Sequence, residues 1–176
     1  MEENQTVTEP APRIAICPGS YDPPTNGHLD IIARTASIFD RVVVGVVGRT
    51  ARKKEKLFTP AERAGFINEA IADRGLGNVE VEVFTNLLVD FARDHGARAV
   101  VKGLRAISDF EYELEMNQIN RRLAPEIESV YVFASPEFSF LSSTGVKEMA
   151  AFGADISELV TPTVAAALAE RMGPDA

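Results

Sequence analysis

The chain has 176 residues, a length that fits one globular domain whose core needs no disulfide or metal staple. Its 18 basic and 26 acidic residues give a net charge of −8, which disfavours broad electrostatic binding to nucleic acid or to an anionic membrane. Cys17 is the only cysteine, so no disulfide can form within the chain and a reducing compartment is expected. With only two histidines besides, a structural zinc site is not expected.

The distribution of apolar and polar residues along the chain predicts neither a membrane span nor a signal peptide. No stretch approaches the roughly 18 consecutive apolar residues of a membrane span, and the acidic, polar N-terminus lacks the pattern of a signal peptide. Residues 1–12 are predicted to form a disordered tail, because Pro10 and Pro12 oppose regular structure there. Residues 13–176 are predicted to form the single domain, and a cytoplasmic location is expected.

Short apolar runs alternate with longer amphipathic runs along the chain. The short runs predict strands at 13–17, 41–48, 79–84, 98–101 and 129–133. The longer runs predict helices at 28–39, 87–95, 107–123, 143–152 and 162–171, and a further helix that opens with Thr59 as cap, Pro60 at the first position and Glu62 completing a capping box. This alternation predicts a Rossmann-like α/β domain with a parallel five-stranded sheet and helices on both faces.

Ligands of such sheets bind beyond the carboxyl ends of the strands, and the segment after the first strand is unusual. Residues 18–28 combine a Pro-Gly turn, two further prolines and Gly27 directly before a helix. The start of that helix offers unpaired N–H groups and a positive dipole end, which suit an anion, and His28 falls in its first turn. A solvent-facing histidine in a tight loop is the ordinary alternative for a lone histidine.

Three other segments at strand ends carry polar chemistry. Lys102 and Arg105 are predicted to lie in a glycine-bent turn after the fourth strand, although two surface cations are the common alternative. Ser142, Ser143 and Thr144 open a helix, where hydroxyl groups either cap the helix or bind phosphate. Residues 49–56 form a basic loop, and a charge run of this kind is normally solvated.

Four segments together resemble the bacterial phosphopantetheine adenylyltransferases, which belong to the nucleotidyltransferase superfamily with its (H/T)xGH motif. In one-letter code these segments read GSYDP and TNGH within residues 19–28, KGLR at 102–105, DFEYE at 109–113 and SFLSSTGVKE at 139–148. The resemblance runs from about residue 13 to residue 171. It implies transfer of an adenylyl group from ATP to 4′-phosphopantetheine, with Mg²⁺ as cofactor and a homohexameric assembly. No nucleic-acid or membrane partner is expected, as the acidic composition already indicated.

The resemblance also implies roles for individual residues. His28 would stabilise the transition state, with Lys54 and Arg105 as further catalytic groups. The acceptor would be bound by Ser20, Lys54, Leu88 and Lys102. The ATP site would comprise Ser20, Tyr21, His28, Gly103, Leu104, Arg105, Glu113, Phe138, Ser139, Phe140, Leu141, Ser142, Ser143 and Thr144. No metal ligand is assigned to the protein.

The basic loop departs from the shorter segment of the family. Counting back from Leu57 favours Lys54 over Lys53 as the lysine that meets the acceptor phosphate, and Lys56 is expected to face water. Leu88 would touch the pantetheine arm, although an apolar residue is more often part of the core. The case for Glu113 depends on the motif alone, because a helical glutamate is usually solvated.

The chemistry fits these roles, and two alternatives stay open. An acceptor phosphate is already an anion, so the reaction needs positioning and charge neutralisation and no general base. One alternative is a related nucleotidyltransferase acting on nicotinamide mononucleotide or a phosphorylated alcohol, which the DFEYE and SSTGVKE stretches disfavour. The other is a nucleotide-sensing module without turnover, which the intact His28, Lys102 and Arg105 disfavour.

Overall fold

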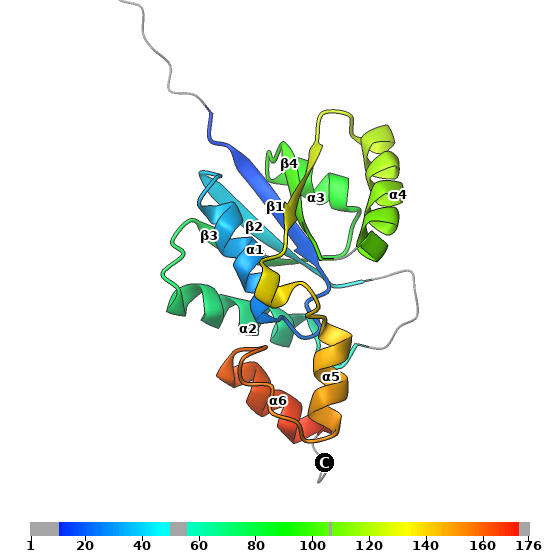
Figure 1. Cartoon of the computed structure of the whole chain (residues 1–176). Helices are drawn as coiled ribbons and strands as arrows, with labels where there is room; N and C mark the ends of the chain where they lie inside the picture. Colours follow the sequence, from blue (N-terminus) through cyan, green and yellow to red (C-terminus); the bar gives the residue numbers. More distant parts are fainter. Residues whose placement is uncertain (1–10, 50–55, 106, 173–176) are drawn as a thin grey trace, which may run out of the picture.

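The computed structural model describes residues 11–49, 56–105 and 107–172 (Figure 1). The strands within these ranges are β1 (Ile14–Gly19), β2 (Arg41–Val47), β3 (Val79–Phe84), β4 (Ala99–Leu104) and β5 (Glu128–Phe133). The helices are α1 (Asn26–Ala36), α2 (Pro60–Asp73), α3 (Leu88–Asp94), α4 (Ile107–Leu123), a 3₁₀ turn (Pro136–Phe138), α5 (Ser143–Ala151) and α6 (Pro162–Met172).

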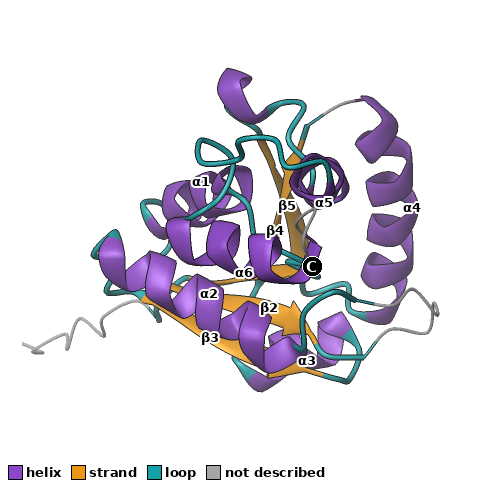
Figure 2. Ribbon diagram, turned by 90° about the horizontal axis from the view of Figure 1, so that it is seen from below, coloured by secondary structure: helices purple, strands orange, loops and turns teal. Residues whose placement is uncertain are grey.

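The five strands form one sheet in the order β3-β2-β1-β4-β5, and every neighbouring pair is parallel. Side chains of β1 alternate between two apolar clusters: Ala15 and Cys17 pack with α1 and α2, whereas Ile16 packs with α3. Helices therefore cover both faces of the sheet (Figure 2). The predicted Rossmann-like α/β fold is confirmed.

A third apolar cluster lies beyond the carboxyl edge of the sheet. It joins α5 and α6 through Val146, Ala150, Val164 and Leu168 and includes Phe58, which precedes α2. Figure 1 shows α5 and α6 together below the end of β1. This cluster therefore supports the segments that surround the ligand-binding edge of the sheet.

The first strand is longer than predicted, and it separates from β4 before it ends. β1 pairs with β2 at six positions as far as Gly19, but with β4 only at Ala15 and Ile16. The carbonyl of Ile14 accepts a hydrogen bond from the backbone N–H of Arg98, so the backbone polar groups of Ile14 point toward β4. In a strand, the backbone polar groups of every second residue point the same way, so those of Pro18 also face the β4 side. At Pro18 the pairing with β4 has already ended, so the missing N–H of proline costs no hydrogen bond of the sheet. The strand therefore continues through Pro18 to Gly19, and the predicted end at Cys17 is wrong.

The fourth strand also extends beyond its prediction. Lys102, Gly103 and Leu104 continue β4 and pair with residues 131–133 of β5, so the predicted glycine-bent turn at Lys102 is wrong. Close packing explains the glycine at this position, because a Cβ at Gly103 would lie 3.0 Å from Cγ1 of Ile31 in α1. Gly103 therefore permits close packing of α1 on β4, and Arg105 directly follows the strand.

The remaining predicted elements agree within one residue, except α1. This helix begins two residues earlier than predicted, because Thr25 is its N-cap, and it ends at Ala36. Of the predicted tail, residues 1–10 lie outside the described ranges, while Ala11 and Pro12 are exposed and lack regular structure. Among the described helices, none combines the length and the apolar composition that a membrane span requires.

Candidate active site

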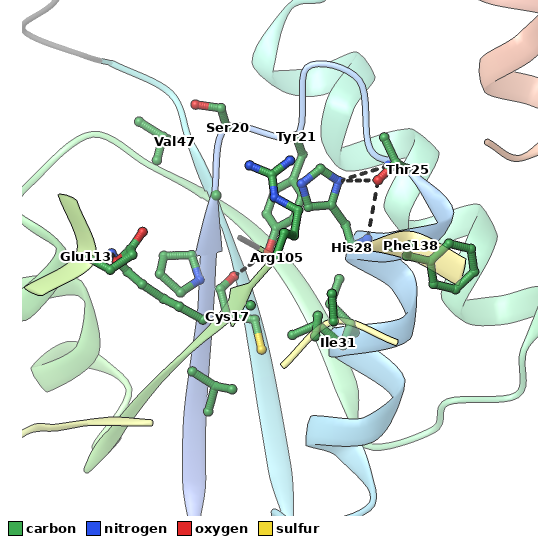
Figure 3. A pocket seen from close by; sticks show the side chains of 18 of the residues that line it. Cys17, Ser20, Tyr21, Thr25, His28, Ile31, Val47, Arg105, Glu113 and Phe138 are labelled. Carbon is green, nitrogen blue, oxygen red and sulfur yellow. Dashed lines mark hydrogen bonds and ion pairs between the residues drawn. The ribbon is translucent and has the colours of Figure 1, made fainter. Parts of the chain in front are cut away.

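A cavity of about 480 Å³ opens at the carboxyl edge of the sheet, where β1 and β4 have separated (Figure 3). Its walls include Gly19 at the end of β1, Ser20 directly after it and Gly103 near the end of β4. This position is the topological switch point, where the strand order reverses and where open α/β sheets bind their ligands. Ten of the residues predicted for the site line it: Ser20, Tyr21, His28, Leu88, Lys102, Gly103, Arg105, Glu113, Phe138 and Leu141.

The other predicted residues lie elsewhere. Lys54 is outside the described residues, and the cavity walls do not include Leu104, Ser139, Phe140, Ser142, Ser143 or Thr144. Two of the hydroxyl groups have structural partners: Ser142 Oγ accepts from Gly145 N–H and caps α5, and Ser143 Oγ donates to the Pro23 carbonyl. The Phe140 side chain is 96% exposed. Their roles in ATP binding stay predictions.

His28 is part of the start of α1, as a reciprocal capping box with Thr25 shows (Figure 3). The backbone N–H of Thr25 donates to Nδ1 of His28 at 3.0 Å, and the Thr25 hydroxyl oxygen accepts from the His28 N–H at 3.4 Å. Because Nδ1 is the acceptor, the ring proton of a neutral His28 lies on Nε2. The ring is therefore a hydrogen-bond donor on the side away from the helix cap.

The helix start itself offers fewer free amides than the sequence indicated. The N–H of Asn26 donates to the Leu159 carbonyl at 2.8 Å, and the N–H of His28 is used by Thr25. Two of the first-turn amides thus already have protein acceptors. An anion beside α1 would consequently meet the imidazole of His28 as a principal donor, together with the dipole of the helix.

The electrostatic environment keeps His28 neutral. Burial lowers its pKa to about 4, and the positive charge of Arg105 acts in the same direction. The ring also packs edge-on against Tyr21, with centroids 5.2 Å apart and planes at 79°. Tyr21 is itself fixed, because its hydroxyl donates to the Cys17 carbonyl at 2.9 Å. At neutral pH, His28 is therefore a rigid, uncharged donor.

Two cations, Lys102 of β4 and Arg105 directly after it, line the same cavity, and each has a protein partner. Lys102 Nζ is 2.6 Å from Oε2 of Glu113, and both side chains are mostly buried. Arg105 Nη1 donates to the Leu141 carbonyl at 2.8 Å. Glu113 thus neutralises and orients Lys102, while its contact with ATP stays a prediction.

Lys56 does not simply face water, contrary to the prediction. Its Nζ donates to the Ser20 hydroxyl oxygen at 2.9 Å, and its side chain is half-buried. The cause lies in Asp22, whose carboxylate accepts the N–H groups of Leu57 at 3.0 Å and Phe58 at 2.9 Å. These bonds hold the segment that carries Lys56 against the loop after β1.

Sequence reasoning assigned no role to Asp22, although it lies inside the GSYDP motif. It is buried and forms an ion pair with Lys147 of α5 at 3.2 Å. Burial opposes its charged form, but the hydrogen bonds from Phe58 and Leu57 and the charge of Lys147 outweigh that effect, so its pKa lies below the usual range. Asp22 thus joins the loop after β1 to the segment before α2 and to α5.

Cys17 lines the cavity without nucleophilic character. Burial raises the pKa of its thiol to about 12, against a smaller opposite effect of its hydrogen bond to Thr35. The thiolate is the reactive form of cysteine, so this side chain contributes an apolar wall and not a covalent intermediate.

Comparison with known proteins agrees with this geometry. The Cytidylyltransferase-like family model matches residues 16–149. The phosphopantetheine adenylyltransferase of Rubrobacter xylanophilus is 57% identical over 147 residues, covering 84% of this chain and 87% of that protein. This chain belongs to the phosphopantetheine adenylyltransferase family. The enzyme of that name from Heliobacterium modesticaldum is 49% identical and covers 91% of this chain and 93% of its own length.

Solved structures support the fold of this phosphopantetheine adenylyltransferase family member. A putative nicotinate-nucleotide adenylyltransferase from Vibrio parahaemolyticus superposes with a TM-score of 0.68 and covers 91% of this chain and 93% of that one. Its sequence identity is only 20%, so the likeness concerns the fold alone. The resemblance that the four motifs predicted is confirmed by the family members at higher identity.

The two histidines are expected to titrate at well-separated pH values. His28 should titrate near pH 4, because its partly buried ring is shielded from water and resists protonation. Burial also opposes protonation of His95, but its bonds to the Phe91 carbonyl and Glu82 outweigh that effect and raise its pKa above 6.5. NMR titration of the ring protons measures both values.

The variant His95→Gln serves as the control for this titration, since it removes one of the two signals and so assigns the other. The low pKa of His28 also makes the stability of the fold depend on pH. The unfolded chain binds the proton near pH 6.5 and the folded chain does not, so this group reduces stability as the pH falls from 6.5 to 4. A His28 signal that titrates at 6.5 or above would contradict the account.

Proposed function

We propose that this chain transfers the adenylyl group of ATP to 4′-phosphopantetheine, giving dephospho-coenzyme A and pyrophosphate. Membership of the phosphopantetheine adenylyltransferase family is the observation that carries this proposal. The geometry supports it, because the cavity combines a neutral donor, His28, with the cations Lys102 and Arg105. A site of this composition is suited to binding phosphate groups. The transfer reaction does not require the protein to supply an activated nucleophile.

The proposed reaction is a direct displacement. An oxygen of the acceptor phosphate forms a bond to the α-phosphorus of ATP while the bond to the pyrophosphate oxygen breaks. The acceptor is already ionised, so no proton has to be removed. The protein would align the two substrates between β1 and β4 and stabilise the charge that develops on the α-phosphate, to which Nε2 of His28 would donate.

The cations would divide the work of neutralisation between the two substrates. Lys102 would hold the acceptor phosphate, and its pairing with Glu113 at 2.6 Å supports this role because the ion pair keeps the ammonium group at the cavity wall. Arg105 would contact ATP, and its bond to the Leu141 carbonyl fixes the guanidinium beside His28. Lys54 would add a contact to the acceptor.

Mg²⁺ would enter as part of the ATP complex. The donor set does not fit a resident metal: in the described ranges, no group of three or more His, Cys, Asp or Glu side chains could hold a metal ion. The nearby carboxylates of Glu113 and Asp22 are paired with lysines. The ion would therefore be held by the phosphate oxygens of the substrate.

We also propose a homohexamer in the cytoplasm. The family resemblance is the basis for the assembly, and exposed apolar side chains on α4, including Phe110, Leu114 and Leu123, support self-association. The buried free thiol of Cys17 fits a reducing compartment.

A panel of acceptors tests the reaction directly. Pyrophosphate release from ATP is measured with phosphopantetheine, with nicotinamide mononucleotide and with pantetheine, which lacks only the phosphate. Turnover with phosphopantetheine alone is expected. Turnover with nicotinamide mononucleotide would favour a related nucleotidyltransferase, and ATP binding without any turnover would favour a sensing module.

Replacement of the donor should affect the chemical step. His28→Ala is expected to reduce kcat by on the order of 10²–10³, the cost of losing one donor to developing charge, with a modest loss of ATP affinity. His95→Ala is the matched control, because it removes an imidazole that contacts Glu82 and does not line the cavity. This variant should retain its turnover. Near-normal turnover of His28→Ala would refute the transition-state role.

The two cations should be separable by binding measurements. Lys102→Ala is expected to weaken phosphopantetheine more than ATP, and Arg105→Ala to weaken ATP more than phosphopantetheine. Calorimetric titration of each ligand into each variant measures the difference. Arg34→Ala, which removes a surface guanidinium bound to the Phe133 carbonyl, controls for general effects. Equal losses of both ligands in both variants would contradict the division of roles.

A further inference from the structure

Arg63 of α2 is among the most completely buried side chains in the described part of the chain, at 1% exposure. Its guanidinium donates to three backbone carbonyls: Nε to Phe58 at 3.0 Å, Nη1 to Val47 at 3.1 Å, and Nη1 also to Ser20. A buried cation is costly unless its donors are satisfied. The three carbonyl acceptors offset this cost, and they show which backbone segments Arg63 holds together.

The three carbonyls belong to three different segments at the cavity. Ser20 follows β1, Val47 ends β2, and Phe58 precedes α2; Ser20 and Val47 line the cavity. One rigid, planar group thus fixes the distances among these segments. Lysine could not replace it, because a single ammonium group on a flexible stem lacks the fork of donors that reaches all three carbonyls.

The same segments carry a polar pair that the family motifs do not assign to a common task. Lys56 Nζ donates to the Ser20 hydroxyl oxygen at 2.9 Å. Arg63 binds the backbone of Ser20 itself and the backbone of Phe58, two residues after Lys56. Asp22 adds the amides of Leu57 and Phe58 to this framework. Both members of the pair are therefore held through their own or adjacent peptide groups.

We propose that Arg63 is a positioning residue that sets Ser20 and Lys56 to bind a substrate phosphate at the mouth of the cavity. A hydroxyl donor next to an ammonium group matches the oxygens of a phosphate, to which charge-assisted hydrogen bonds are strong. Lys56 is then a phosphate-contacting cation additional to Lys54 and Lys102. This inference rests on the proposed function for the identity of the phosphate-bearing substrates.

A mutant comparison separates positioning from general stabilisation. Arg63→Lys retains the charge, and Arg63→Met retains the length; both are measured in the wild-type background and in a Ser20→Ala, Lys56→Ala background. We expect Arg63→Lys to lower kcat/KM by about tenfold or more in the wild-type background, because small displacements of positioning groups have large effects on rate. In the double-variant background the same change should cost less than about twofold, since the pair that Arg63 positions is gone.

Ile67→Ala is the matched control, because Ile67 is fully buried one turn further along α2 and its apolar side chain forms no hydrogen bond to Ser20, Val47 or Phe58. It should lower the melting temperature while leaving the KM values close to those of the wild type. An equal loss for Arg63→Lys in both backgrounds would overturn the proposal and leave Arg63 a structural residue. Full activity of Arg63→Lys would overturn it as well.

Two readouts keep this test distinct from the test of the reaction. Turnover of the wild type with phosphopantetheine examines the proposed function alone. The affinity for ATP, measured by calorimetry for the same variants, requires no turnover and should show the same dependence on background. Loss of ATP affinity that depends on Ser20 and Lys56 supports the positioning role even if another acceptor proves to be the substrate, and additive losses refute it.

Discussion

The reciprocal hydrogen bonds between Thr25 and His28 connect the fold of this protein to its chemistry. They start α1, and they fix the orientation of the imidazole because Nδ1 accepts the Thr25 N–H. The same bond places the ring proton on Nε2. Burial and the nearby Arg105 then keep the ring neutral. A single local motif thus supplies a donor that does not change its charge near neutral pH.

The sheet provides the space that this donor needs. β1 and β4 pair at only two positions and then separate, while each stays paired with its outer neighbour, β2 or β5. The opening therefore does not weaken the rest of the sheet. Around it, Asp22 and Arg63 connect the backbone of adjoining segments, and the cluster of Phe58 with α5 and α6 supports them from below.

Much of this arrangement could be predicted from the sequence, and the exceptions have physical causes. Apolar periodicity predicted the strands and most helices, and the motifs placed His28, Lys102 and Arg105 near one another. The start of α1 was missed because histidine replaces the usual Glu or Gln at the third helical position of a capping box. Proline and glycine usually end strands, but Pro18 and Gly103 stay within β1 and β4 because they are paired with Gly45 of β2 and Val132 of β5. Asp22 and Arg63 were missed because their contacts join segments that are distant in sequence.

The tautomer of His28 is the most direct test of this account. Two-bond ¹H–¹⁵N correlation spectra of the uniformly ¹⁵N-labelled protein at neutral pH distinguish the two neutral forms and the imidazolium. The account predicts that Nδ1 of His28 is unprotonated and Nε2 carries the proton, as the Thr25 N–H contact requires. A His28 ring protonated on Nδ1, or on both nitrogens, would contradict the proposed origin of the donor and the role assigned to it.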